Sequence, residues 1–264
     1  MKKLFAMLLA VLMVVSLAAC GGDVKGETET TAPETTAPET TEPAETTPEV
    51  TEPVETTPVE TEGVMTYAEY MAAAKDDAVT VECYVQATQS WWDNKITVYA
   101  QDQDGAYFIY ELACSEEDAA KLTAGTKIQV VGFKGEWAGE IEIVDATFTF
   151  VEGADTFVAE PLDVTSLLGT EDLIKHQNEK VAFKGLTIEA ISYKNGEPGD
   201  DIYVTVKLGE NTYDFCVERY LTGPETDVYK AFAELQAGDV VDMEGFLYWY
   251  EGVNTHITAV AKAA

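Results

Sequence analysis

The stretch "KLTAGTKIQVVGFKGEWAG" (residues 121–139) occurs again, in diverged form, as "ELQAGDVVDMEGFLYWYEG" (residues 234–252). The two stretches align without a gap at a shift of 113 residues. The positions that they share are Leu122, Ala124, Gly125, Gly132, Phe133 and Gly139, which recur as Leu235, Ala237, Gly238, Gly245, Phe246 and Gly252. Six identities in register, three of them glycines, indicate one structural unit that the chain uses twice.

Alternating apolar residues and turn residues predict the same order of elements, β-β-β-α-β-β, around both stretches. In the first copy we expect strands at 78–89, 95–101, 106–113, 126–134 and 140–150, with a helix that begins after Ser115 and ends near Gly125. In the second copy the strands fall at 179–193, 201–209, 211–220, 239–249 and 253–263, with a helix at 226–238. Thr66 and Glu69 form a capping box that predicts a short helix before the first copy. The fifth strands align poorly, which predicts a bulge or a one-residue slip in one copy.

This order, with "AGTKIQVVGF" and "AGDVVDMEGF" leading into the fourth strand, resembles the OB-fold, a five-stranded Greek-key barrel. The resemblance covers nearly all of residues 64–264. It implies a mainly β protein with two tandem OB-fold-like barrels, at 64–156 and 157–264, each with a helix between strands 3 and 4. It also implies where a ligand would lie: on the face of strands 2 and 3, between the loops that join strands 1 to 2 and 4 to 5.

The first twenty residues are predicted to direct export. Two lysines precede an apolar run from Leu4 to Ala19 that is too short for a spanning helix of about 20 residues. The ending Leu17-Ala18-Ala19-Cys20 resembles the bacterial lipobox, which implies that residues 1–20 are a lipoprotein signal and that Cys20 is lipidated. We therefore expect the protein on the outer face of the bacterial cytoplasmic membrane. Residues 21–63 are rich in Thr, Glu and Pro and are predicted to be a disordered tether.

The folded part is strongly acidic. Of the 16 basic and 48 acidic residues, 3 and 12 precede Val64, which leaves 13 and 36 and a net charge of −23. Because this charge should repel polyphosphates and anionic lipids, we expect nucleic acid to be disfavoured and membrane contact to be limited to the lipid anchor. The partner we expect is an unidentified extracytoplasmic ligand or protein.

The four tryptophans all fall in the two loops that OB-folds use for ligands. The predicted ligand-binding residues are Trp91 and Trp92 in the first copy's loop between strands 1 and 2, Trp137 in its loop between strands 4 and 5, and Tyr248, Trp249 and Tyr250 in the second copy's loop between strands 4 and 5. Flat aromatic rings there could stack on a sugar, a base or a partner's side chain. The alternative is that they cap the barrel ends or fill the joint between the two barrels.

No motif indicates catalysis, a cofactor or a metal. Asp102 and Asp104 precede a glycine as in a calcium loop, but the twelfth position is Ala113 instead of glutamate, so we expect a simple turn. His176 and His256 lack a serine or cysteine in a motif context. Besides Cys20 there are Cys83, Cys114 and Cys216, which allow at most one disulfide, and Cys83 alternates in phase with core valines.

Three functions remain open. The first is a non-enzymatic, membrane-tethered binding protein whose loop aromatics hold a glycan, a cell-wall fragment or a peptide. The second is nucleic-acid binding, which the resemblance alone suggests. The third is a structural or assembly role in an envelope complex, with the aromatics buried in an interface.

Overall fold

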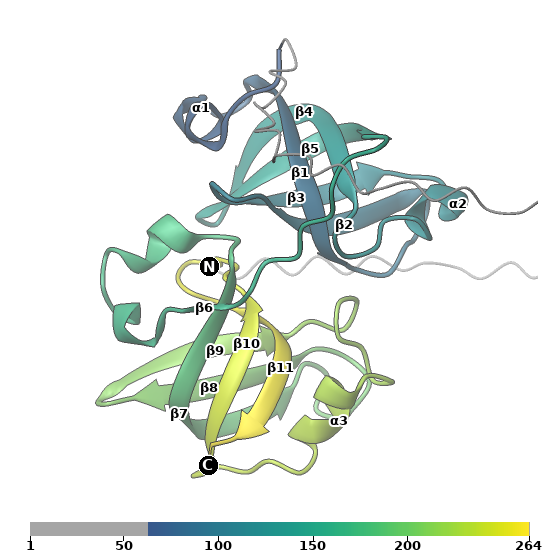
Figure 1. Ribbon diagram of the computed structural model, residues 1–264. Coiled ribbons are helices and arrows are strands. Elements are labelled where there is room, and N and C mark those ends of the chain that lie inside the picture. Colours follow the sequence, from purple (N-terminus) through teal and green to yellow (C-terminus); the bar gives the residue numbers. More distant parts are fainter. Residues whose placement is uncertain (1–62, 264) are drawn as a thin grey trace, which may run out of the picture. The chain divides into compact units, whose positions relative to one another are not determined.

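The computed structural model describes residues 63–263, so the predicted signal with Cys20, and the tether up to residue 62, lie outside the described residues. The first domain is built on a closed barrel with strand order β1-β2-β3-β5-β4 (Figure 1). Its strands are β1 (Ala78–Thr88), β2 (Lys95–Gln101), β3 (Ala106–Ala113), β4 (Lys127–Trp137) and β5 (Glu140–Phe150).

The second domain repeats this scheme of pairings. Its strands are β6 (Leu162–Asp163), β7 (Lys180–Tyr193), β8 (Ile202–Leu208), β9 (Asn211–Val217), β10 (Val240–Phe246) and β11 (His256–Lys262). The sheet order is β10-β11-β9-β8-β7-β6, and β10 also pairs with β7. Five strands therefore form the same ring of pairings as in the first domain, while β6, which the sequence did not predict, is added at the edge. The predicted fold class, mainly β with two tandem OB-fold-like barrels, is confirmed.

Each domain has its own apolar core. In β1 the inward side chains are Val79, Val81, Cys83 and Val85, which confirms the core position predicted for Cys83. Phe183 and Phe215 fill the second domain, with ring centroids 4.9 Å apart. Cys83, Cys114 and Cys216 are all buried and unpaired.

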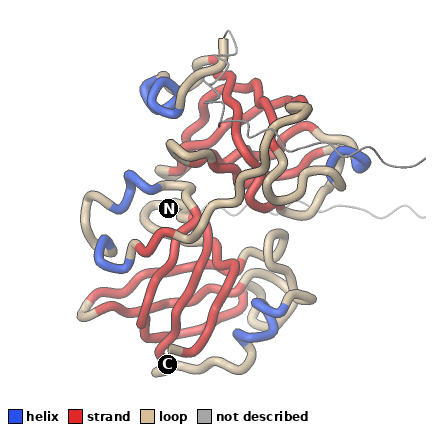
Figure 2. The backbone as a smooth tube through the Cα atoms, in the orientation of Figure 1, coloured by secondary structure: helices blue, strands red, loops and turns tan. Residues whose placement is uncertain are grey.

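The helices are short and lie outside the sheets, where the predicted caps start them (Figure 2). They are α1 (Tyr67–Ala72), α2 (Glu116–Ala119) and α3 (Asp227–Phe232), with 3-10 turns η1 (Thr165–Leu167) and η2 (Leu173–His176). The capping box of Thr66 and Glu69 is present, and the Ser115 and Thr226 side chains cap α2 and α3. At the far end of α1, the buried Lys134 donates to the carbonyls of Tyr70, Met71 and Ala73. The predicted helix after Ser115 is much longer than the four residues observed.

The predicted slip between the fifth strands is present. Val130 pairs with Phe148 in the first domain, and its repeat equivalent Met243 pairs with Val260. The fourth strands thus align at a shift of 113 and the fifth strands at 112. Both strand pairs also carry an irregularity, after Val131 and after Glu244, so the bulge is shared, and beyond it the β10–β11 hairpin is one residue shorter than the β4–β5 hairpin.

Candidate functional site

A tight turn that begins at Trp92 joins β1 to β2. Trp92 and Lys95 face each other as a bridge and exchange two backbone hydrogen bonds of 3.0 Å. Between them, Asp93 and Asn94 have φ angles of 49° and 61°. Two consecutive positive φ angles define the type I′ turn favoured in two-residue hairpins, and Asp and Asn tolerate this conformation better than most residues. The sequence "WDNK" therefore sets Trp92 beside the first residue of β2.

Because neighbouring residues on extended backbone point to opposite sides, only one indole of the pair faces outward. Trp91 packs against the core of the first barrel, and its Nε1 donates to the Cys114 carbonyl at 2.8 Å. Trp92 is 74% exposed. Of the two predicted binding residues, the structure leaves only Trp92 available to a ligand.

A bulge in β3 adds a second aromatic residue to the same surface. The pairing of β2 with β3 shifts between Ile96 and Val98, opposite Tyr110 and Glu111. Glu111 has a φ of 48°, and its amide donates to Oγ1 of Thr97 at 3.2 Å. Bulges redirect side chains and are frequent beside functional sites. Here the bulge leaves the Tyr110 ring exposed on the face of β2 and β3, where the OB-fold resemblance implies a ligand.

The second domain contributes a third aromatic residue. Tyr220 follows β9, and its carbonyl accepts hydrogen bonds from the amide of Ser90 at 2.7 Å and the Ser90 hydroxyl at 3.3 Å. Its ring is half exposed, and the Arg219 guanidinium lies 5.0 Å from the ring centroid. These contacts fix Tyr220 next to the turn that carries Trp92.

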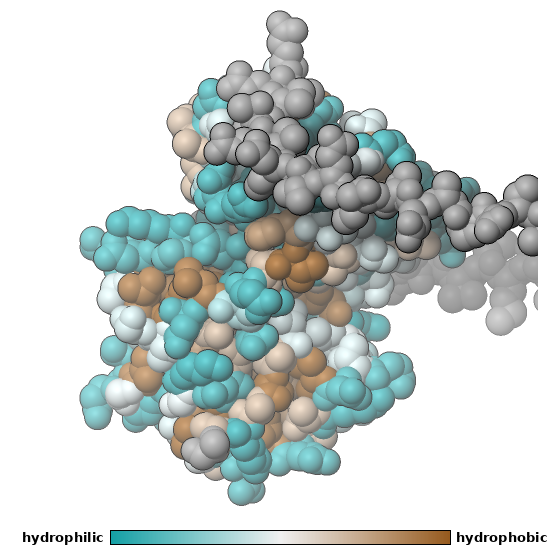
Figure 3. Space-filling view, viewed as in Figure 1, coloured by the Kyte–Doolittle hydropathy of each residue, from teal (hydrophilic) through white to brown (hydrophobic). Residues whose placement is uncertain are grey.

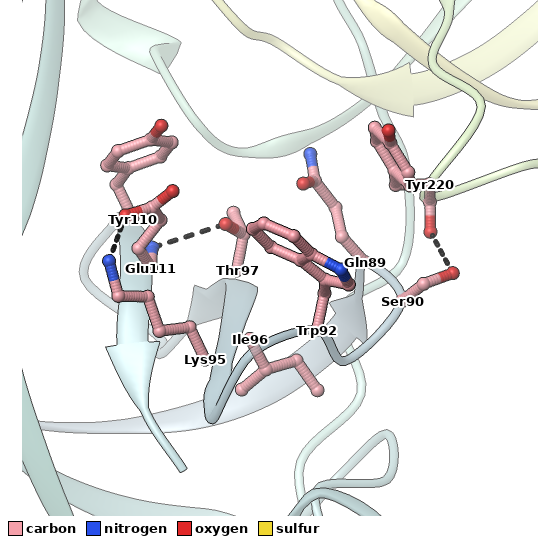
Figure 4. A pocket seen from close by; sticks show the side chains of 9 residues that line it. All are labelled: Gln89, Ser90, Trp92, Lys95, Ile96, Thr97, Tyr110, Glu111 and Tyr220. Carbon is pink, nitrogen blue, oxygen red and sulfur yellow. Dashed lines mark hydrogen bonds and ion pairs between the residues drawn. The ribbon is translucent and has the colours of Figure 1, made fainter. Parts of the chain in front are cut away.

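We call the resulting depression the aromatic groove. It has a volume of about 340 Å³ and is lined by Gln89, Ser90, Trp92, Lys95, Ile96, Thr97, Tyr110, Glu111 and Tyr220. Figure 4 shows Trp92 near the middle, with Tyr110 and Tyr220 on opposite sides and the Gln89 amide between them. On the face seen in Figure 3, hydrophobic residues form small groups among hydrophilic ones.

The groove offers flat rings and hydrogen-bonding groups with little net charge. Lys95 Nζ lies 2.7 Å from a Glu111 carboxylate oxygen, and this hydrogen bond and the charge of Glu111 raise the pKa of Lys95. The Gln89 amide, which lines the groove, donates to the Tyr99 hydroxyl through Nε2 at 3.1 Å. Such an arrangement can hold a ring-shaped ligand by stacking and by hydrogen bonds at the ring edge.

The other predicted binding residues lie elsewhere. Trp137, the last residue of β4, and Tyr250, on the β10–β11 connection, are both exposed. The two hairpins are joined where the Glu251 amide donates to the Ala138 carbonyl at 2.7 Å. Trp249 is half-buried against the core of the second domain. Tyr248 is also half-buried and stacks on His256 with centroids 4.2 Å apart. The alternative that aromatics fill the joint between the barrels therefore describes Tyr248 and Trp249 best.

The domain interface is centred on Tyr99 and Phe108, which sequence reasoning missed. Both lie on the outer face of the first barrel, yet they are 1% and 3% exposed because Phe246 and Tyr248 of the second domain cover them. The Tyr99 ring stacks on Phe246 with centroids 4.6 Å apart. The available signal was the alternation of β2 and β3, which puts these two aromatic residues opposite the core residues Val98 and Ile109.

A buried carboxyl group crosses the same interface. Glu140 is fully buried, and its Oε2 accepts from the Trp249 amide at 2.7 Å and from the Gln177 side chain at 3.2 Å. Burial raises the pKa of Glu140 to about 8, more than these hydrogen bonds lower it. Within residues 63–263 its Oε1 has no hydrogen-bond partner. Glu140 therefore contributes to the contact between the domains mainly in its protonated form at neutral pH.

The structure adds little to support other sites. The Asp102 carboxylate accepts from the amides of Asp104 and Gly105, which is the simple turn expected there. Among residues 63–263 no cluster of three or more His, Cys, Asp or Glu side chains could hold a metal ion. Over the same range, no helix has the length and apolar character needed to cross a bilayer.

No protein-family model and no curated protein matches the chain. Among solved structures it is similar to the p204 HINb domain, with 11% identity and a TM-score of 0.34, over 72% of this chain and 100% of that chain. It is also similar to a murine DNA-binding protein bound with double-stranded DNA, with 12% identity and a TM-score of 0.34, over 70% of this chain and 96% of that chain.

A third similar structure is a replication protein A heterotrimer bound to single-stranded DNA, with 11% identity and a TM-score of 0.29, over 71% of this chain and 49% of that chain. Because two of them were solved with DNA, they contradict our expectation from net charge that nucleic acid is disfavoured as a partner, and we withdraw that expectation.

Proposed function

We propose that this protein is a non-enzymatic binding protein that holds a glycan in the aromatic groove. The observation that carries the proposal is that three exposed aromatic side chains from separate segments, Trp92, Tyr110 and Tyr220, line one groove on the strand 2 and 3 face of an OB-fold-like domain. Exposed aromatic rings that converge on a concave surface are characteristic of recognition sites.

The groups around the rings favour a sugar. The Lys95–Glu111 pair presents one positive and one negative charge at the rim, and hydroxyl and amide groups supply the remaining polar contacts. A sugar ring has an apolar face that stacks on an indole and hydroxyl groups around its edge that hydrogen-bond to such side chains. A cell-wall fragment would meet these requirements through its glycan part.

Single-stranded nucleic acid is the second candidate. The specific observation in its favour is that Arg219, the only arginine of the chain, lies over the Tyr220 ring beside the groove, with Lys95 also at the rim. Stacked bases on aromatic platforms contribute about 1–3 kcal/mol each, and neighbouring cations contact the phosphates.

A titration with matched variants tests the proposal. The full-length protein in detergent is titrated with chito-oligosaccharides, neutral glucan oligosaccharides and single-stranded oligonucleotides, and binding is followed by calorimetry. Trp92→Ala should weaken binding of the true ligand by about 5- to 150-fold, because stacking on one ring contributes about 1–3 kcal/mol. Trp137→Ala is the control, since Trp137 is also an exposed tryptophan but does not line the groove.

The salt dependence separates the two candidates. Glycan binding should be nearly independent of salt, whereas oligonucleotide binding should weaken linearly in log K with log salt concentration. If Trp92→Ala binds every probe as tightly as the parent protein, the groove is not the binding site and the proposal fails.

We also propose that the groove is displayed outside the cell. The apolar leader and the lipobox-like ending before Cys20 support a lipid anchor, and the Thr/Glu/Pro-rich segment supports a tether between this anchor and the folded domains.

A further inference from the structure

The aromatic face of the first domain continues beyond the groove. In β3, Tyr110 in the groove and Phe108 in the domain interface are two residues apart on one face, with nearly parallel rings and centroids 6.5 Å apart. In β2, Thr97 in the groove is followed on the same face by Tyr99, which pairs directly with Phe108. The open groove and the buried interface are therefore two parts of one aromatic row.

The second domain covers the inner part of this row with side chains of similar chemistry. Phe246 stacks on Tyr99, and Tyr248 packs edge-on against Phe108 with centroids 5.1 Å apart. Nδ1 of His256 lies 2.6 Å from the Tyr99 hydroxyl. Rings of the second domain thus occupy the positions at which a ring-containing ligand would stack on an OB-fold face.

This interface is much smaller than either domain core. Among residues 63–263 its apolar cluster contains only Tyr99, Phe108 and Phe246 as buried members, with three partly buried neighbours, whereas each domain core is a far larger cluster. Many of its other contacts are polar, among them the bond from the Lys180 amide to the Gln101 side chain and the buried Glu140. Small polar interfaces between domains permit relative motion, because little apolar surface is exposed when they open.

We propose that the second domain is a reversible cover on the ligand face of the first domain, and that its release adds Tyr99 and Phe108 to the groove as further stacking positions for a longer ligand. The inference that a longer ligand is taken up rests on the proposed function, whereas the reversible opening of the interface does not. Phe246 and Tyr248 act as internal competitors for these positions.

Hydrogen exchange tests the opening without any ligand. The amides of Ser90, Lys180, Trp249 and Glu251 donate across the interface, so they lose their partners when the domains separate. In the full-length protein these four amides should exchange at least tenfold faster than the paired amides within β2 and β8. If the four exchange only as slowly as those strand amides, the interface opens only on unfolding and the inference is wrong.

A matched pair of variants tests whether the Phe246 ring holds the interface closed. Phe246→Ala removes the ring that stacks on Tyr99, and Phe133→Ala is the control because Phe133 is the repeat equivalent of Phe246 and is exposed on the first domain. Phe246→Ala should speed exchange of the four interface amides at least tenfold more, while Phe133→Ala should leave them unchanged. Strand amides of the second domain show whether Phe246→Ala has instead unfolded that domain.

The ligand length at which affinity stops increasing then tests whether Tyr99 and Phe108 act as further stacking positions. For whichever probe binds, chito-oligosaccharides or single-stranded oligonucleotides of increasing length, the parent protein should reach its limiting affinity at a shorter length than Phe246→Ala. Adding Tyr99→Ala to Phe246→Ala should abolish the extra gain. Equal limiting lengths in the parent and in Phe246→Ala would overturn the added positions. If no probe binds at all, the proposed function fails, and the exchange rates alone decide whether the interface is a reversible cover.

Discussion

The Tyr99 hydroxyl of the first domain lies 2.6 Å from Nδ1 of His256 in the second domain, inside the domain interface. The same hydroxyl accepts from the Gln89 amide, so Tyr99 donates to a neutral imidazole. Burial lowers the pKa of His256 to about 3, and the negative charge of Asp201 opposes this shift.

His256 should therefore make the protein sensitive to acid. Between pH 6.5 and about 3 the unfolded chain binds a proton on His256 that the folded protein does not, so this residue lowers the free energy of unfolding as the pH falls through that range. In His256→Gln this contribution should be absent. Urea unfolding at pH 7 and pH 4 measures it: the parent should lose more stability than the variant, and equal losses would contradict the assignment.

Glu140 should act in the opposite direction. Its pKa is raised from 4.5 to about 8, so above pH 4.5 the unfolded chain releases a proton that the folded protein retains. Stability should therefore fall as the pH rises from 4.5 and level off above 8. Glu140→Gln keeps the shape of the side chain without this ionisation. The difference in urea midpoint between Glu140→Gln and the parent should become more positive from pH 5 to pH 8.5. The parent must be measured at each pH because Glu218, with a pKa raised to about 7, contributes to the pH dependence in the same direction.

The two neighbouring tryptophans should differ sharply in their effect on stability. Trp91→Ala removes a ring packed on the barrel core and the bond to the Cys114 carbonyl, which should cost about 3 kcal/mol. Trp92→Ala should change stability by less than about 0.5 kcal/mol, because the side chain is exposed. Denaturant unfolding compares them, and similar losses would show that the two side chains do not point to opposite sides as described.

The type I′ turn predicts a ranking at Asn94. Its φ of 61° suits glycine, so Asn94→Gly should leave stability within about 0.5 kcal/mol of the parent, whereas Asn94→Val should cost about 1–2 kcal/mol through strain. Since the turn positions Trp92, Asn94→Val should also weaken ligand binding. A valine variant as stable as the glycine variant would argue against this turn.

The lipid anchor predicts a change in fractionation. With Cys20 as the acceptor, Cys20→Ser should move the protein from the membrane pellet to the soluble fraction, because a lost acyl chain removes about 0.8 kcal/mol per buried CH₂. Cys83→Ser, in the barrel core, is the control, and its folded fraction should stay membrane-bound. A membrane-bound Cys20→Ser protein would refute the anchor.

The repeat made most of the fold predictable. β2, β3 and β5 begin and end at the predicted residues because strict alternation and turn residues bound them. The short α2 was predicted too long, since propensity does not reveal where packing ends a helix. β6 was missed because two residues carry no periodicity.

The site was only partly predictable, because the sequence gives the position of a loop but not the surface that covers it. Trp92 could be found from its loop, whereas the place of Tyr110 beside it depends on how β3 pairs with β2, and Tyr220 depends on contact with the other domain. Phe133 and Phe246 illustrate the limit. They occupy the same position of the repeat, yet one is exposed and the other is buried under its neighbour, a difference that only the docking of the domains creates.

The bonds from Ser90 to the Tyr220 carbonyl and from Glu251 to the Ala138 carbonyl join the two domains through main-chain atoms. Every amino acid except proline can donate a bond of this kind, so these positions can change their side chains during evolution while the domains keep the same register. Descendants of this chain could thus acquire new residues around the groove, and with them new ligands, without having to rebuild the joint on which the groove depends.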